Sequence, residues 1–210
     1  MMKAGKACFV VAVMMMGGLA MADPGKGGSA PAQQGDVEDL PVCYARGTDT
    51  LGSAVDAVAV ADLNATTNVG NPGFDAGLAL YRACFSDDFS FTLQFDGVTA
   101  LTVPDPATRT ADTDAALQWA NFVNNAFRGP GYKNTQHHMG SISSEIRGRH
   151  AQVVSYLIAT HTYGPAGAAP EGSTAVVGGT YTDEAVREHG HWVIKQRTLN
   201  ITSSITHLAP

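Results

Sequence analysis

The sequence predicts an α+β fold in which a cone-shaped, curved antiparallel sheet packs on three N-terminal helices. Two observations lead to this prediction. Up to about residue 128, apolar residues recur mainly at helical spacing, whereas from Thr135 onward they alternate with polar residues, as in half-buried strands. A strongly bent sheet of this kind wraps around a helix and leaves a cavity between the two layers.

The start of the chain has the three-part layout of a secretory signal peptide. Two lysines precede an apolar run over residues 7–20, and Ala20 and Ala22 place small residues before a cut at Asp23. The run is shorter than a membrane-spanning helix requires. We therefore expect residues 1–22 to be removed near Ala22-Asp23 and the mature protein to be periplasmic or secreted.

The expected mature chain is acidic and of single-domain length. Loss of the signal peptide removes two of the 13 Lys and Arg residues and none of the 19 Asp and Glu residues, so the formal net charge changes from −6 to −8. Without a basic cluster, nucleic acid and anionic membranes are not expected partners. No later segment is apolar enough for a stable membrane anchor. We expect a flexible leader over residues 23–38, a domain over 39–202 and a tail over 203–210.

The first helix is expected to begin at Asp39, which can act as its N-cap, with Pro41 in the first turn. Leu40, Tyr44 and Leu51 then recur at helical spacing.

Residues 53–70 form a long segment with weak periodicity. A loop of this length is unusual in a compact domain. We consider a lid over the pocket and a tolerated insertion, and favour the insertion.

Two further helices are expected. One runs from Asn71-Pro72 to the Asp87-Asp88 pair that ends it, and the other begins at Asp112 or Asp114 and stops at Gly129. Between them, residues 89–95 alternate Phe and Leu with polar residues, an Asp-Gly turn follows, and residues 101–103 pair back. Four more strands, separated by glycine-containing turns, are expected over 135–146, 151–163, 176–188 and 191–202.

Two cysteines, Cys43 and Cys84, remain in the expected mature chain, and both fall on predicted helices. The exported compartment would permit a disulfide. Their Cα separation does not follow from the sequence. A disulfide and two packed thiols both stay open, and we favour the thiols.

Several stretches in fixed order carry a family resemblance. They are Tyr-Ala-Arg-Gly-Thr-Asp over residues 44–49, Thr-Gln-His-His-Met-Gly over 135–140, Ala-Thr-His-Thr-Tyr over 159–163, and the run from Gly179 to Leu199. Together they resemble the SnoaL-like branch of the nuclear transport factor two superfamily over about residues 39–201. This fold hosts isomerases, dehydratases, cyclases and proteins without catalytic activity.

The resemblance also suggests a site. In the scytalone dehydratase pattern, the Thr-Gln-His motif and a second histidine one strand later match His137 and His161, and an aspartate of the first helix falls on Asp49. Bile-acid dehydratases are similar: Tyr44 and Asp49 reproduce their tyrosine and aspartate, and His137 their histidine. Where those enzymes carry a second acid, this chain has His161.

These positions imply acid–base chemistry. A carboxylate that accepts a hydrogen bond from one ring nitrogen of a histidine fixes the tautomer and raises the basicity of the other nitrogen. We expect Asp49 to meet His161 in this way, His137 to be the second member of an acid–base pair, and Tyr44 to donate a hydrogen bond. No metal or cofactor is required. The expected pocket wall consists of Phe91, Trp119 and Tyr181.

We therefore predict an exported, cofactor-independent lyase or isomerase of dehydratase type. Its expected substrate is a small, largely apolar carbonyl compound, such as a steroid-, polyketide- or aromatic-like molecule. The tyrosines that hold the leaving water in scytalone dehydratase would fall near Thr48 and Leu93, and neither residue can play that part. The substrates of that enzyme are therefore not implied.

Two alternative functions stay open. A binding protein would hold an apolar ligand unchanged, with His and Asp too far apart to bond. A structural module would have a filled cavity and a dimer formed through the open sheet face. A homo-oligomer, dimer or trimer, is expected from the resemblance in any case.

A zinc site at His189 and His191 lacks a convincing third ligand. His138, next to His137, is expected to be exposed.

Overall fold

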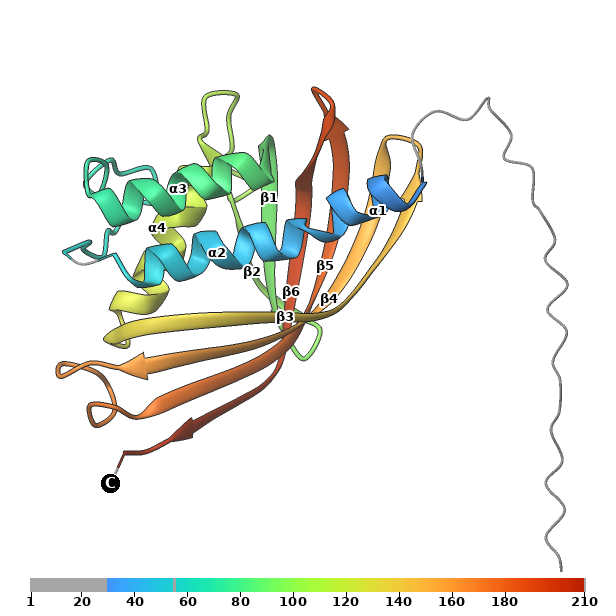
Figure 1. Cartoon of the computed structure of the whole chain (residues 1–210). Coiled ribbons are helices and arrows are strands. Elements are labelled where there is room, and N and C mark those ends of the chain that lie inside the picture. The colour runs from blue at the N-terminus through green and yellow to red at the C-terminus, as the bar shows by residue number, and fades with distance from the viewer. Residues whose placement is uncertain (1–29, 55, 210) are drawn as a thin grey trace, which may run out of the picture.

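The structure of the chain, a computed structural model, describes residues 30–54 and 56–209 (Figure 1). The expected signal peptide and residues 23–29 of the expected leader lie outside the described residues. The elements follow the order α1 Ala30–Glu38, α2 Leu40–Gly52, α3 Pro72–Cys84, β1 Phe85–Phe95, β2 Val98–Val103, α4 Ala115–Arg128, β3 Tyr132–Arg147, β4 His150–Tyr163, β5 Thr174–Glu188 and β6 His191–His207.

The strands form one six-stranded sheet in the order β2-β1-β6-β5-β4-β3. As predicted, β3 to β6 pair as an antiparallel meander. The pairing of β1 with β6 is parallel, so the sheet is mostly antiparallel with one parallel pair. These two strands are far apart in the chain, and no local turn sets their relative direction. Figure 1 shows the long strands curving, with α2, α3 and α4 on the concave side of the sheet.

The second part of the expected flexible leader is helix α1. Its Val37 is fully buried, and the Glu38 carboxylate accepts a hydrogen bond from Ser144 Oγ on β3 at 2.8 Å. The Asp39 N–H donates to the Gly35 carbonyl at 3.1 Å, so Asp39 continues helical backbone and its side chain makes no cap. One buried valine in a polar segment was too weak a signal to predict this helix.

The boundary between α3 and β1 also differs from the expectation. Helix α3 begins after Asn71, whose side chain accepts from the Gly73 and Phe74 N–H groups, but it ends at Cys84 rather than at the Asp87-Asp88 pair. Phe85 continues the apolar spacing of the helix, yet its backbone is extended. Its ring stacks on Phe89 with centroids 3.8 Å apart.

Strand β6 is longer than predicted. It runs to His207, and residues 203–207 pair with Thr174–Gly178 of β5, so most of the expected C-terminal tail belongs to the sheet. The side chains of 203–207 are all exposed. Because they do not alternate between a buried and an exposed face, the sequence lacks the pattern that identifies a strand.

A disulfide joins Cys43 on α2 to Cys84 at the end of α3, with Cα atoms 6.0 Å apart. The expectation of two packed thiols is therefore wrong. Close packing of α2 on α3 brings the two positions within bonding range. The disulfide ties α2 to the junction between α3 and β1.

Side-chain amides fasten the long segment between α2 and α3, both internally and to α4. Asn68, within the segment, accepts from the Val58 N–H and donates to the Val58 carbonyl, both at 2.9 Å. Asn125 on α4 makes the same two bonds with Val60, at 2.8 and 2.7 Å. Asn121, fully buried on α4, donates to two more carbonyls of the segment. These bonds replace the ladder that an irregular backbone lacks.

The outer face of the sheet carries exposed apolar side chains, among them Tyr156, Ile158 and Ile205, at 58%, 56% and 57% exposure. The expected homo-oligomer stays a prediction. None of the helices in the described part of the chain is long and apolar enough to cross a membrane.

Candidate active site

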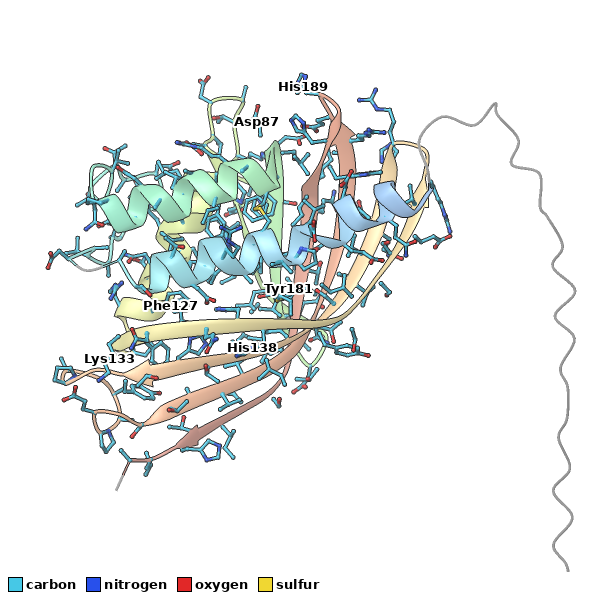
Figure 2. The ribbon with its side chains drawn as sticks, in the orientation of Figure 1. Asp87, Phe127, Lys133, His138, Tyr181 and His189 are labelled. Carbon is cyan, nitrogen blue, oxygen red and sulfur yellow. A yellow bond between two sulfur atoms is a disulfide. The ribbon has the colours of Figure 1, made fainter. Side chains whose placement is uncertain are left out.

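A cavity of about 170 Å³ lies between the helices and the concave face of the sheet. Figure 2 shows Phe127 from α4 and Tyr181 from β5 in the space between these two layers. The lining residues come from α2, α4 and five strands. They are Tyr44, Thr48, Phe91, Leu93, Trp119, Phe122, Val123, Ala126, Phe127, His137, Leu157, Ala159, His161, Val177, Tyr181, Leu199 and Ile201.

The cavity brings together all but one of the residues singled out in the sequence. Both histidines and the four expected aromatic side chains line it. Asp49 does not line the cavity itself but contacts His137 from the side of α2. The segment between α2 and α3 contributes no described residue to the wall, which favours the insertion over the lid.

The carboxylate of Asp49 holds His137 by two atoms. Its Oδ1 lies 2.7 Å from His137 Nδ1, and its Oδ2 accepts from the His137 backbone N–H at 3.1 Å. The expected pairing of Asp49 with His161 is therefore wrong. Strand β3 is at the edge of the sheet, next to α2, whereas β4 lies one strand further away, and so the carboxylate reaches β3 first.

A close contact between α2 and β3 sets this geometry. A Cβ atom placed on Gly52 at the end of α2 would lie 2.0 Å from Thr135 Cγ2 and 3.3 Å from Phe127 Cε2. Only glycine leaves room for the approach that delivers Asp49, one helical turn earlier, to His137. The absence of a side chain at Gly52 was a signal in the sequence, but its partner could not be identified there.

His161 is held by a residue that the sequence analysis did not assign a role. Its Nδ1 lies 2.8 Å from Thr135 Oγ1, and its ring stacks on Tyr132 with centroids 4.8 Å apart. Burial lowers the pKa of His161 to about 4, helped by the nearby His137 and opposed by Asp49. His161 is thus neutral at pH 7, and its ring centroid is 5.7 Å from that of His137.

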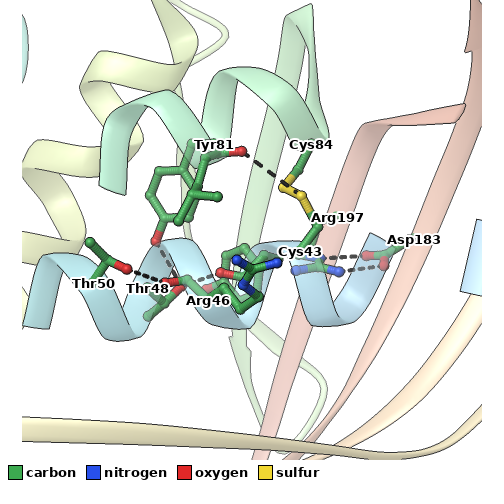
Figure 3. Close-up of a disulfide and its surroundings, with 10 residues drawn as sticks. Cys43, Arg46, Thr48, Thr50, Tyr81, Cys84, Asp183 and Arg197 are labelled. Carbon is green, nitrogen blue, oxygen red and sulfur yellow. Dashed lines mark hydrogen bonds and ion pairs between the residues drawn. A yellow bond between two sulfur atoms is a disulfide. The ribbon is translucent and has the colours of Figure 1, made fainter. Parts of the chain in front are cut away.

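At another part of the cavity wall, the rings of Tyr44 and Tyr181 contact the guanidinium of a buried ion pair. The guanidinium of Arg197 lies over the Tyr44 ring at 4.1 Å and over the Tyr181 ring at 4.6 Å. Arg197 is bound in turn by Asp183 through two bonds of 2.5 and 2.6 Å, which Figure 3 shows beside the disulfide and Thr48. The Tyr181 hydroxyl donates to that of Tyr44 at 3.4 Å.

Arg197 and Asp183 are both fully buried. Burial alone would lower the pKa of Arg197, but the charge and hydrogen bonds of Asp183 outweigh it and raise the pKa. Burial raises the pKa of Tyr44, and the positive charge of Arg197 opposes this change. Tyr44 is therefore a neutral phenol at pH 7 and can act as a hydrogen-bond donor.

The remaining histidines lie away from the cavity. His138 is exposed on the outer face of the sheet, as expected, and His189 is exposed at the turn between β5 and β6 (Figure 2). His191, which begins β6, is also exposed. Among the described residues, no three His, Cys, Asp or Glu side chains are grouped so that they could hold a metal ion.

The arrangement is suited to moving one proton. With Asp49 accepting from Nδ1–H of His137, the unshared electron pair is on Nε2, which has no hydrogen-bond partner among the described residues. The neutral imidazole of His161 and the hydroxyls of Tyr44 and Tyr181 line the same apolar cavity. Hydrogen bonds to a developing negative charge are stronger there than in water.

Comparison with known proteins supports the fold. A model of the SnoaL-like domain matches residues 59–198. No curated protein matches the chain in sequence. Among solved structures, a nuclear transport factor two-like superfamily protein from Salmonella enterica superposes with a TM-score of 0.52 at 12% identity, over 83% of this chain and 94% of that one.

Two other similar structures are of proteins named for a reaction. One, provisionally named a scytalone dehydratase, from Novosphingobium aromaticivorans, has a TM-score of 0.51 at 16% identity and covers 83% of this chain and 87% of its own. The other, a hexachlorocyclohexane dehydrochlorinase from Novosphingobium barchaimii, has a TM-score of 0.52 at 14% identity and covers 84% and 93%. At this identity the likeness concerns the fold alone.

Proposed function

The chain belongs to the SnoaL-like domain family of the nuclear transport factor two-like superfamily, and on this basis we propose that it is a cofactor-independent lyase or isomerase that removes a proton from carbon. The observation that carries the proposal is the two-point contact of Asp49 with His137 at the wall of an apolar cavity. A binding protein has no need of an imidazole whose tautomer is fixed in this way.

In the proposed reaction, Nε2 of His137 takes the proton from a carbon next to an electron-withdrawing group. Asp49 stabilises the imidazolium that forms, without accepting the proton itself. The electron pair of the broken C–H bond forms a double bond. In an elimination, a leaving group then departs with the electron pair of its bond to carbon. In an isomerisation, the proton returns to another carbon.

Negative charge develops on the substrate oxygen or the leaving group during this step. Tyr44 is a neutral phenol that lines the cavity and is suited to donate a hydrogen bond there. His161 is neutral, and it is a second donor when Thr135 Oγ1 donates to its Nδ1 and the ring hydrogen is on Nε2. Two such hydrogen bonds stabilise the transition state more than the uncharged substrate.

The names of two similar structures agree with this proposal. A dehydratase and a dehydrochlorinase are both named for an elimination. Elimination of either kind requires a base that removes a proton from carbon. The expectation of dehydratase chemistry is thus retained as a proposal, and the natural leaving group is left open.

We also propose that the protein acts outside the cytoplasm. The Cys43–Cys84 disulfide supports this location, because such bonds persist in oxidising compartments and are rare in the cytosol. The signal-peptide pattern at the start of the sequence points the same way.

Proton removal can be tested without the natural substrate. Cyclohexanone in D₂O exchanges the hydrogens next to its carbonyl when a base removes them, and NMR measures the rate. We expect the protein to accelerate this exchange above the buffer rate and His137→Ala to abolish the acceleration. Exchange that is equally fast with His137→Ala would contradict the proposal and favour a ligand-binding protein.

A further inference from the structure

We infer that the site accepts an uncharged molecule built on a single six-membered ring with one hydrogen-bonding oxygen. The role of the oxygen in this substrate class rests on the proposed function. The size and charge of the ring rest on the cavity alone. It narrows the expectation from the sequence, which included steroid-like and polyketide-like molecules.

The first argument is volume. The cavity measures about 170 Å³. An apolar cavity of roughly 150 Å³ in another protein accommodates one benzene molecule, whereas pockets for drug-sized ligands occupy about 300–1,000 Å³. One ring with a small substituent fits the cavity, and a fused ring system does not.

The second argument is charge. No Asp, Glu, Lys or Arg lines the cavity among the described residues. Its titratable neighbours are His137, which is engaged by Asp49, neutral His161, and the phenols. Arg197, behind the phenols, is fully buried and bound to Asp183, and so it is not available to a ligand carboxylate. An ionised ligand would lose its hydration without gaining a partner.

The third argument is the distribution of polar groups over an otherwise apolar wall. Ring contacts join Phe127 to both imidazoles, and separate contacts join Tyr44 to Phe91 and Tyr181. The base and the phenol hydroxyls therefore belong to different clusters. A ring with one oxygen directed to the phenols and an acidic C–H directed to His137 satisfies both clusters.

Titration calorimetry on the disulfide-bonded protein tests the class with matched probes. Cyclohexanone is the neutral ring, cyclohexanecarboxylate and cyclohexylammonium are its charged counterparts, and decalone is the fused-ring ketone. We expect cyclohexanone to bind and each ion to bind on the order of tenfold more weakly or worse. We expect no binding of decalone.

A mouth-blocking variant shows whether the cavity is the binding site. Ala126 on α4 lines the cavity and is exposed, so it lies at the mouth. Ala126→Phe is expected to abolish cyclohexanone binding. Ala79→Phe makes the same change at an exposed alanine of α3 that does not line the cavity, and it should leave binding unchanged.

The outcomes separate this inference from the proposed function. Equal binding of cyclohexanecarboxylate or decalone, no binding of any probe, or binding that survives Ala126→Phe would overturn the substrate class. Binding and exchange are measured separately on the wild-type protein. If it binds cyclohexanone with the expected selectivity but exchanges its hydrogens no faster than the buffer does, the proposed function fails and the substrate class stands.

Discussion

Asp49 binds His137 at two points, by the imidazole Nδ1 at 2.7 Å and by the backbone N–H at 3.1 Å. The His137 side chain is 6% exposed and that of Asp49 30% exposed, so the imidazole faces the cavity while the carboxylate lies closer to solvent. Because the same carboxylate fixes both the strand backbone and the ring, the position of the imidazole is determined by α2 and β3 together.

Asp49→Asn is expected to slow the His137-dependent exchange of cyclohexanone by roughly 10²–10⁴-fold. An amide can donate to Nδ1 and so favours the tautomer that leaves a hydrogen on Nε2. ¹⁵N NMR of His137 would show this change directly. Asp112→Asn, the same change at an exposed aspartate away from the cavity, serves as the control. An unchanged tautomer and rate in Asp49→Asn would remove Asp49 from the mechanism.

Gly52→Ala is expected to destabilise the protein by about 1–3 kcal/mol and to reduce exchange, because the added methyl overlaps Thr135. Urea unfolding measures the first effect. Gly35→Ala, in helix α1, provides the contrast, since a Cβ at that position meets nothing within 4 Å. That change should be neutral or stabilising by up to about 1 kcal/mol. Equal effects of the two substitutions would contradict the close-contact argument.

The fold class and six of the 17 residues that line the cavity could be predicted from local pattern and family resemblance. The pairing of Asp49 with His137 rather than His161 could not, because it depends on which strand lies beside α2 and on the depth of the Gly52 contact. Both are tertiary facts. The disulfide was missed for the same reason, since a Cα separation does not follow from spacing along helices.

The Arg197–Asp183 pair is a different case, because the sequence carried a signal for it. Asp183 alternates with Tyr181 and Ala185, and Arg197 shares a strand face with Leu199. A charge at a buried position on each of two predicted neighbouring strands indicates an ion pair. The same alternation that predicts the strands places both charges on their buried face.

Stability should increase with pH between about 4 and 6.5 because of His161. Burial lowers its pKa to about 4, so between these values the unfolded chain binds a proton that the folded protein does not. The full effect, reached above pH 6.5, is roughly 3 kcal/mol at about 1.4 kcal/mol per pH unit. Urea unfolding at several pH values measures it. In His161→Gln this part of the slope should disappear, and an identical slope in both proteins would refute the assignment.

Loss of the disulfide should lower the free energy of unfolding by about 4 kcal/mol, the chain-entropy value for a loop closed across 41 residues. Cys43→Ala combined with Cys84→Ala tests this by urea unfolding. Adding a reductant to the wild type should shift its unfolding midpoint toward that of the double variant and leave the midpoint of the double variant unchanged. A wild-type midpoint that does not respond to complete reduction would show that the bond contributes nothing to stability.

Breaking the buried ion pair should be far more costly than replacing it. Asp183→Asn leaves the Arg197 charge uncompensated in the core, and we expect a loss of about 3–5 kcal/mol. Replacing both charges, as in Asp183→Leu with Arg197→Met, should restore most of this loss, because the pair is itself incompletely satisfied: Arg197 Nη1 has no hydrogen-bond partner among the described residues. Urea unfolding of the single and double variants compares the two.

The double variant should still lose exchange activity, since Tyr44 and Tyr181 would no longer contact the guanidinium. A double variant that is stable and fully active would show that the pair serves neither stability nor the position of the phenols.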